Sequence, residues 1–243
     1  MHRFFINEDC ITQSTVAIPA KLVHRLRNVL RLRAGDHIVV LDNSGWEYEV
    51  ELGEVSDSGL EGLIVGKSPS VGEPQTSITL YQALLKGSSF DLVLQKCTEI
   101  GVTAFVPVVC ERCVAGGPDS GRLGRWQRII LEATQQSRRG KLPQLHPVIP
   151  FSEACESATG LSLLPWEGET TRGIGDVLRS YSRDERSHEV SIFVGPEGGF
   201  TAEEVGLALS HGITPVSLGS RILRAETAGL VTAAITLYEF GST

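Results

Sequence analysis

The sequence predicts an α/β protein of two domains: a small β-rich domain, then a larger domain built on a mainly parallel sheet. Up to about residue 68, short strand-like runs are separated by turns and interrupted by one helical pattern. Residues 68–76 are rich in Pro, Gly and Ser, a composition typical of a linker. After this segment, strand-like and helix-like runs alternate, which favours parallel strands with helices on both faces of the sheet.

The composition is typical of a folded domain with an apolar core, since 41% of the residues are hydrophobic and 21% are charged. No apolar run is long enough to span a bilayer, and the short apolar patch at the N-terminus meets Glu8 and Asp9 at once. We therefore expect neither a membrane partner nor a signal peptide. Five cysteines, an odd number, indicate free thiols in a reducing cytoplasm.

The first domain is expected to form a small β-barrel with one helix. Apolar residues at helical spacing predict this helix over residues 19–30. Strands are predicted over residues 37–41, 46–52 and 60–65. In the strand 46–52, Glu47, Glu49 and Glu51 alternate with apolar residues, so we expect a half-buried strand with an acidic outer face.

Two stretches are basic although the formal net charge of the chain is -7. Between Lys21 and Arg33 there are five Lys or Arg residues and no acid. Between Arg112 and Lys141 there are seven Lys or Arg residues and two acids. A solvated helix surface explains such stretches, and so does a surface that binds phosphate groups, because only a local region needs to be basic.

The second domain is expected to contain alternating strands and helices around a parallel sheet. Its strands are predicted over residues 78–84, 104–109, 161–164, 190–194 and 214–218. Its helices are predicted over residues 90–100, 123–138, 174–180, 202–210 and 225–240. In the helix 123–138, Leu123, Trp126, Ile130 and Ala133 form an apolar stripe that predicts the buried face.

Two glycine-bearing loops, Gly195–Phe200 and Ser217–Ala228, each follow a strand-like run and lead into a helical pattern. Parallel sheets bind ligands at the carboxyl ends of their strands, so the loops predict one small-molecule site. Thr201 and Glu204 predict a capping box for the next helix. A plain tight turn is the alternative for the first loop. The spacing matches neither the dinucleotide-binding nor the P-loop fingerprint, which disfavours an oxidoreductase.

The second loop carries Arg221, Arg224 and Glu226, which predict either a charged cluster beside the glycine loop or a surface ion pair. Cys110 and Cys113 form a single Cys-x-x-Cys pair. Zinc needs further ligands, and none is suitably clustered nearby, so we interpret both cysteines as ordinary thiols and expect no metal.

Motifs spread over the full length of the chain match one known family. They are His24–Arg31, Ala34–Asp36, Lys86, Lys96–Val102, Arg125–Ile129, Glu132–Arg139, Gly195–Gly199 and Leu218–Ala228. Together they resemble the bacterial 16S ribosomal RNA (uracil-N3) methyltransferase family, within the SPOUT class of S-adenosylmethionine enzymes. Ala225 departs from the family pattern, in which threonine is common there, and Cys97 stands where alanine is common.

The resemblance implies a PUA-like RNA-binding β-barrel over residues 1–70 and a SPOUT α/β domain with a deep trefoil knot over residues 75–243. It implies S-adenosyl-L-methionine as the cofactor and a homodimer as the assembly. The implied substrate is 16S ribosomal RNA of the small (30S) ribosomal subunit, methylated at N3 of a uridine. A ribosome-assembly factor that binds RNA without catalysis is the alternative, and cofactor binding measured by calorimetry separates the two.

The resemblance also implies roles for individual residues. The charged residues Arg221, Arg224 and Glu226 are the catalytic candidates, with Glu197 a second carboxylate that could orient an arginine or accept the proton. The expected cofactor-binding residues are Leu164, Pro165, Gly195, Pro196, Glu197, Gly198, Gly199, Leu218, Gly219, Ile222, Leu223, Thr227 and Ala228. The expected RNA-binding residues are Lys21, His24, Arg25, Arg27, Arg31, Arg33, Lys86, Arg112, Arg125, Arg128, Arg138 and Arg139.

Overall fold

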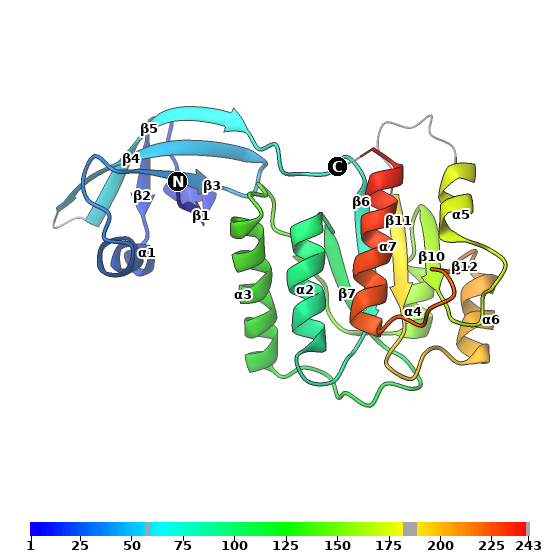
Figure 1. Ribbon diagram of the computed structural model, residues 1–243. Helices are drawn as coiled ribbons and strands as arrows, with labels where there is room; N and C mark the ends of the chain where they lie inside the picture. The colour runs from blue at the N-terminus through cyan, green and yellow to red at the C-terminus, as the bar shows by residue number, and fades with distance from the viewer. Residues whose placement is uncertain (57–58, 182–188, 242–243) are drawn as a thin grey trace. The chain divides into compact units, whose positions relative to one another are not determined.

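The computed structural model describes residues 1–56, 59–181 and 189–241, which form two compact units (Figure 1). The first unit contains residues 1–73 and 134–142, and the second contains residues 74–133 and 143–243. The division after Glu73 falls inside the segment that the composition marks as a linker. The return of residues 134–142 to the first unit has no counterpart in the sequence pattern.

The first unit is built on a curled five-stranded sheet of strand order β1-β3-β4-β5-β2. Its strands are β1 (Arg3–Phe5), β2 (Thr15–Ile18), β3 (His37–Leu41), β4 (Trp46–Ser56) and β5 (Gly59–Pro69). β1 pairs in parallel with β3, and the other pairs are antiparallel. The sheet is curled, and within the described residues no pairing joins β1 to β2.

The predicted helix of the first unit is α1 (Ala20–His24), which continues directly into a π-helical turn, η2 (Arg25–Val29). Leu26 in this turn is fully buried against the sheet. A short 3-10 turn, η1 (Glu8–Cys10), precedes β2. In β4, Tyr48, Val50 and Leu52 are buried, which confirms the predicted half-buried strand.

A buried ion pair holds residues 134–142 to the rest of the first unit. Arg139 is only 2% exposed, and its guanidinium lies 2.9 Å from a carboxylate oxygen of Glu73. The Glu73 carboxylate also accepts the backbone N–H groups of Gly140 and Lys141, at 2.9 and 3.0 Å. Arg139 is therefore committed to the fold, which corrects its expected role as an RNA contact.

The second unit contains one parallel sheet of strand order β12-β10-β11-β6-β7-β8, with β9 also paired to β7. Its strands are β6 (Ser77–Ala83), β7 (Ala104–Val109), β8 (Gln144–Leu145), β9 (Ile149–Pro150), β10 (Leu161–Pro165), β11 (Glu189–Val194) and β12 (Thr214–Val216). The five longer strands fall where the apolar runs predict them. The two-residue strands β8 and β9 were not predicted, because two residues carry no periodicity.

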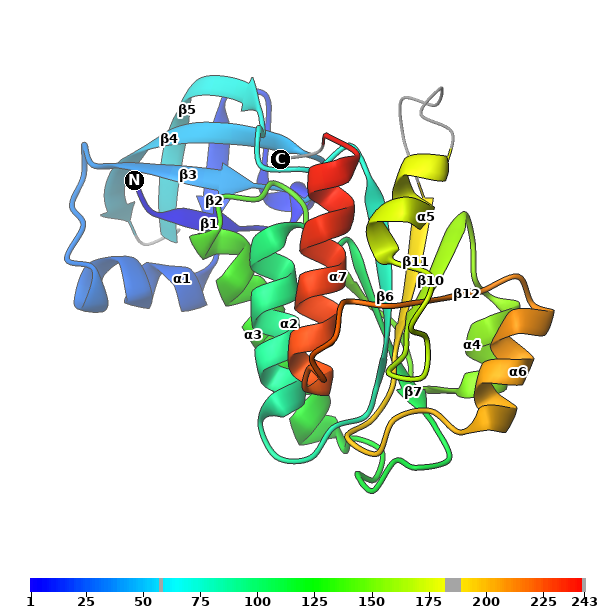
Figure 2. The same ribbon diagram turned by 45° about the vertical axis from the view of Figure 1, so that its right-hand side comes forward.

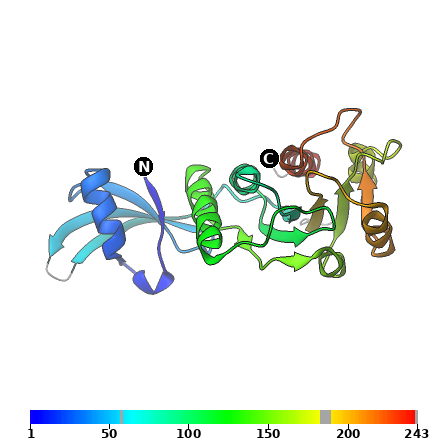
Figure 3. The ribbon, with the colours of Figure 1, turned by 90° about the horizontal axis from the view of Figure 1, so that it is seen from below.

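Helices cover both faces of this sheet, as the alternating pattern predicts. They are α2 (Ser89–Ile100), α3 (Ser120–Gln136), α4 (Phe151–Glu156), α5 (Ile174–Ser180), α6 (Ala202–Ser210) and α7 (Ala225–Glu239). Residues of α2, α3, α5 and α7 share one core, and residues of α4 and α6 share the other. Figure 2 shows α7 between α2 and α5, and Figure 3 shows α2 and α7 on one side of the strands with α4 on the other.

The apolar stripe of α3 is buried as predicted. Trp126 is fully buried, Ile130 and Ala133 are nearly so, and Leu123 packs at the edge of the core. The Trp126 ring stacks on Phe90 at 4.3 Å between centroids. Across the part of the chain that the structure describes, no helix has the length and apolar character needed to cross a membrane.

Candidate functional site

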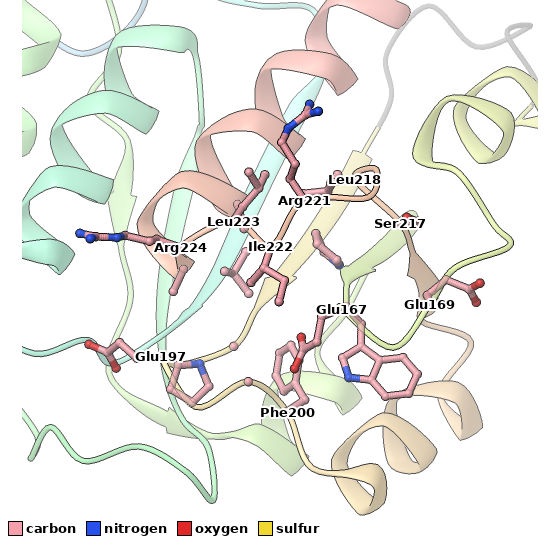
Figure 4. Close-up of a pocket in the computed structure, with 18 of the residues that line it drawn as sticks. Glu167, Glu169, Glu197, Phe200, Ser217, Leu218, Arg221, Ile222, Leu223 and Arg224 are labelled. Carbon is pink, nitrogen blue, oxygen red and sulfur yellow. The ribbon is translucent and has the colours of Figure 1, made fainter.

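A cavity of about 830 Å³ lies in the second unit at the carboxyl ends of β10, β11 and β12 (Figure 4). Three loops form its walls, one after each strand, and the first residues of α2 and α7 complete it. The three loop segments are residues 165–170, 194–200 and 217–224. This is the edge of the sheet at which the sequence places a ligand site.

The first glycine loop, Gly195–Phe200, turns sharply after β11. Gly199 has a φ of +67°, a conformation that favours glycine, and its N–H donates to the Pro196 carbonyl oxygen at 2.9 Å. Thr201 and Glu204 form the predicted capping box, which starts α6 immediately after the loop. The loop is therefore bounded by β11 on one side and by a capped helix on the other.

Neighbouring segments hold this loop from outside. A carboxylate oxygen of Glu197 accepts the backbone N–H of Lys86 at 2.9 Å, which links the loop to the segment after β6. The Arg112 guanidinium donates to the carbonyl oxygens of Gly198 and Phe200, at 2.9 and 3.4 Å. These contacts fix the backbone that lines the cavity.

The second loop, Ser217–Arg224, joins β12 to α7. Gly219 has a φ of +107°, and a Cβ there would meet no atom within 4 Å. The Gly219 N–H donates to the Ser217 hydroxyl at 3.2 Å. Ile222 is 88% exposed at the cavity, and in Figure 4 its side chain extends toward Glu167 and Phe200 of the other two loops.

The charged cluster of the second loop lies at the same cavity. Arg221, Arg224 and Glu226 all line it. Arg224 Nη1 lies 3.9 Å from Glu226 Oε1, and the Arg224 side chain is 87% exposed whereas that of Glu226 is 14% exposed. Figure 4 shows Arg221 and Arg224 extending in different directions. In this cluster, a sheltered carboxylate therefore lies beside two exposed cations.

The third loop follows β10 and was only partly predicted. Trp166, Glu167, Glu169 and Thr170 line the cavity beside Pro165. Hydrogen bonds from the Thr171 hydroxyl and from backbone N–H groups lower the pKa of Glu169 to about 2. The position of these residues directly after the strand 161–164 was the available signal, since all strand ends at this edge of the sheet are equivalent.

Most of the predicted cofactor residues line this one cavity, and two do not. Leu164 is fully buried in the core beside α4 and α6, because adjacent residues of a strand face opposite sides of the sheet. Thr227 lies in the first turn of α7, outside the lining. The predicted residues in the lining are Pro165, Gly195, Pro196, Glu197, Gly198, Gly199, Leu218, Gly219, Ile222, Leu223 and Ala228.

The expected RNA-binding residues other than Arg139 are exposed. Arg125 is also paired with Asp91, at 2.7 Å between Nη2 and Oδ2. Those in the first unit are Lys21, His24, Arg25, Arg27, Arg31, Arg33 and Arg138. Those in the second unit are Lys86, Arg112, Arg125 and Arg128.

The Cys110 and Cys113 thiols interact with each other after β7. The hydrogen bond with the Cys110 thiol lowers the pKa of Cys113 to about 7, and the same hydrogen bond, with burial, raises the pKa of Cys110. All five cysteines are free. In the described ranges no group of three His, Cys, Asp or Glu side chains is arranged to hold a metal ion.

Comparisons with known proteins find similarity over both units. A family model described as an RNA methyltransferase domain matches residues 72–237, and one described as an RNA methyltransferase PUA domain matches residues 20–65. A protein of Synechocystis sp. named ribosomal RNA small subunit methyltransferase E is 37% identical over 237 residues, which cover 96% of this chain and 76% of that protein.

Solved structures show the same similarity. The crystal structure of a ribosomal RNA small subunit methyltransferase E from Neisseria gonorrhoeae bound to S-adenosyl methionine has a TM-score of 0.86 and 33% identity, and the match covers 98% of this chain and 97% of that one. A putative methyltransferase from Legionella pneumophila in complex with bound SAM has a TM-score of 0.82 and 27% identity, with coverage of 97% and 96%.

Proposed function

The chain belongs to the ribosomal RNA small subunit methyltransferase E family, and from this we propose that it uses S-adenosyl-L-methionine to methylate N3 of a uridine in 16S ribosomal RNA. The observation that carries this proposal is the cavity that the glycine loops enclose, in a chain whose structural relatives hold S-adenosylmethionine. In this proposal residues 1–70 bind RNA and residues 75–243 carry out methyl transfer.

The cavity fits a cofactor of this size and chemistry. Its volume of about 830 Å³ lies in the range of small-molecule sites. Gly219 leaves open space where any other residue would place a Cβ. When bound, S-adenosylmethionine supplies a methyl group on a positively charged sulfur. The backbone of Gly195–Gly199 and Leu218–Leu223 would bind its adenosine and methionine parts.

The charged residues of the second loop would act on the uracil. N3 of uridine carries a proton at neutral pH, so its nucleophilicity requires loss of that proton and stabilisation of the resulting anion. Arg221 or Arg224 would stabilise the anion or bind a phosphate group. Glu226 is sheltered and 3.9 Å from Arg224, so it would orient that guanidinium or accept the proton.

The second unit is proposed to contain a deep trefoil knot. The Trp166 N–H donates to the Val216 carbonyl oxygen at 3.1 Å, and the Ser217 N–H donates to the Arg172 carbonyl oxygen at 2.8 Å. Both ends of the loop 166–173 therefore contact the same short stretch of chain, an arrangement that supports threading of that stretch through the loop. Mechanical unfolding tests this, because a tightened knot shortens the extended chain relative to an unknotted one.

A homodimer with α7 at the interface is also proposed. Val231 and Ile235 of α7 are partly exposed, and Tyr238 is 75% exposed, so an apolar stripe of this helix faces outward from the unit. Close packing of a second copy on this stripe would remove it from water. Light scattering at micromolar concentration tests the dimer, and a stable monomer would reject it.

The proposed location is the cytoplasm.

Mass mapping of 16S ribosomal RNA tests the activity. RNA from a deletion strain should lack one methyl group at a uridine, and expression of this protein should restore it. Calorimetry should show that the purified protein binds S-adenosylmethionine. An unchanged mass map would reject the proposed reaction. RNA binding without cofactor binding would instead support the non-catalytic assembly factor.

A further inference from the structure

We infer that Arg112 is a positioning residue of the cofactor site, which holds the Gly195–Phe200 loop in its binding conformation. The inference rests on the proposed function, because it assigns S-adenosylmethionine to the cavity that this loop lines. Arg112 does not line the cavity itself. It lies after β7, outside the three loops that form the walls, and reaches one of them through its side chain.

The guanidinium bonds to the loop at two points. Arg112 Nη1 donates to the Gly198 carbonyl oxygen at 2.9 Å and to the Phe200 carbonyl oxygen at 3.4 Å. Gly198 and Phe200 lie on either side of Gly199, whose positive φ makes the turn. One charged donor thus fixes both sides of the sharpest point of the loop, and charge-assisted hydrogen bonds are stronger than neutral ones.

The aliphatic part of the same side chain contacts the loop. A Cβ at Gly198 would lie 3.2 Å from Cβ and 3.4 Å from Cδ of Arg112, closer than most side chains approach. Arg112 therefore limits the space for a side chain on that side of Gly198.

The residue before Arg112 is held in place by a second contact. The Glu111 backbone N–H donates to a carboxylate oxygen of Glu204 at 2.8 Å, and the other oxygen accepts the Thr201 N–H at 2.9 Å. Glu204 is only 8% exposed. It therefore ties the segment that carries Arg112 to the residue that follows the loop. The two contacts fix the position of Arg112 relative to the loop. This role is distinct from that of an RNA contact.

A double-mutant cycle with calorimetry tests the inference in the full-length protein. Arg112→Ala should weaken S-adenosylmethionine binding about ten-fold, because the loop loses two charge-assisted hydrogen bonds. Gly198→Ala should weaken binding by a similar factor, because the bonded loop cannot move away from the new Cβ. In the double variant the loop is no longer bonded to residue 112, and the close contact with the new Cβ is relieved. The two effects should therefore be strongly non-additive, with a loss of affinity smaller than the sum of the two single losses. Arg112→Lys, which keeps one charged donor, should restore part of the affinity.

Arg128→Ala is the matched control, since it removes an exposed arginine of the same unit. It should leave cofactor affinity at the wild-type value and reduce the salt dependence of RNA binding. Arg112→Ala should instead weaken cofactor binding and leave the salt dependence of RNA binding unchanged. If the wild-type protein binds the cofactor and Arg112→Ala binds it with the same affinity, the role of Arg112 is overturned. Additive effects of the two substitutions in the cycle would also overturn it. A wild-type protein that binds no cofactor would overturn the proposed function itself. Melting temperatures within a few degrees of wild type show that each variant is folded.

Discussion

Glu226 and Arg224 lie within 3.9 Å of each other but differ sharply in exposure, because the carboxylate is sheltered and the guanidinium is open to solvent. A sheltered carboxylate has few competing waters, so its interaction with a uracil or with an arginine is stronger than at the surface. An exposed arginine can in turn move toward a bound RNA. This asymmetry favours Glu226 as the fixed member of the charged cluster.

We expect Glu226→Ala or Arg221→Ala to reduce the methylation rate of the bound complex by about 100-fold or more, the scale of losing one positioned acid–base or electrostatic group. Cofactor affinity should fall much less. Single-turnover assays at saturating cofactor and RNA measure this rate directly. Near-normal rates in both variants would mean that the loop is a binding element and takes no part in the methyl transfer step.

Cys113 should react with iodoacetamide at a lower pH than an ordinary thiol, because the hydrogen bond with the Cys110 thiol lowers its pKa to about 7. The labelling rate should therefore rise through about pH 7 and level off above it, as the thiolate forms. In Cys110→Ala the midpoint should move to higher pH. Peptide mapping resolves Cys113 from the other thiols, and a midpoint near pH 9 in the wild type would contradict the assignment.

At the scale of elements, the feature with the clearest energetic consequence is the contact between Glu73 and residues 139–141. Glu73→Ala would leave the nearly buried Arg139 guanidinium without its carboxylate, and two backbone N–H groups without their acceptor. We expect a loss of about 3 kcal/mol in the free energy of unfolding, measured with urea.

The matched control for that change is Asp176→Ala, which breaks the pair between Asp176 and Arg179 on α5. Their side chains are 76% and 58% exposed, so the loss should be below about 1 kcal/mol. Equal losses in the two variants would show that burial of Arg139 does not set the cost.

Local periodicity explains why the longer elements were predictable and the rest was not. Alternation along β4 and the stripe through Trp126 depend on neighbouring residues, and both are confirmed. The pairing of Glu73 with Arg139 joins positions 66 residues apart, which no local pattern encodes. The loop at Trp166 was only partly predicted, since its place in the site follows from the strand order and not from its own composition.

At the scale of the whole molecule, the first unit carries a basic helix, and the second carries the cavity in which we propose that the cofactor binds. Changing Arg25, Arg27 and Arg31 together to alanine should weaken binding to 16S ribosomal RNA and flatten its salt dependence, because fewer counterions are released. Cofactor affinity should not change. Binding measured over a range of salt concentrations checks this, and an unaltered slope would mean that the helix does not contact phosphate groups.

The three loops around the cavity all lie between residues 165 and 226, late in the chain. A ribosome completes the first unit and the seven described strands of the second before it has made the last of these loops. Because domains fold as they emerge during synthesis, a nascent chain would hold a folded first unit long before it could hold the methyl donor. Binding of RNA and binding of cofactor would therefore be acquired at separate moments in the life of each molecule, the second only after β12 has left the ribosomal tunnel and taken its place in the sheet.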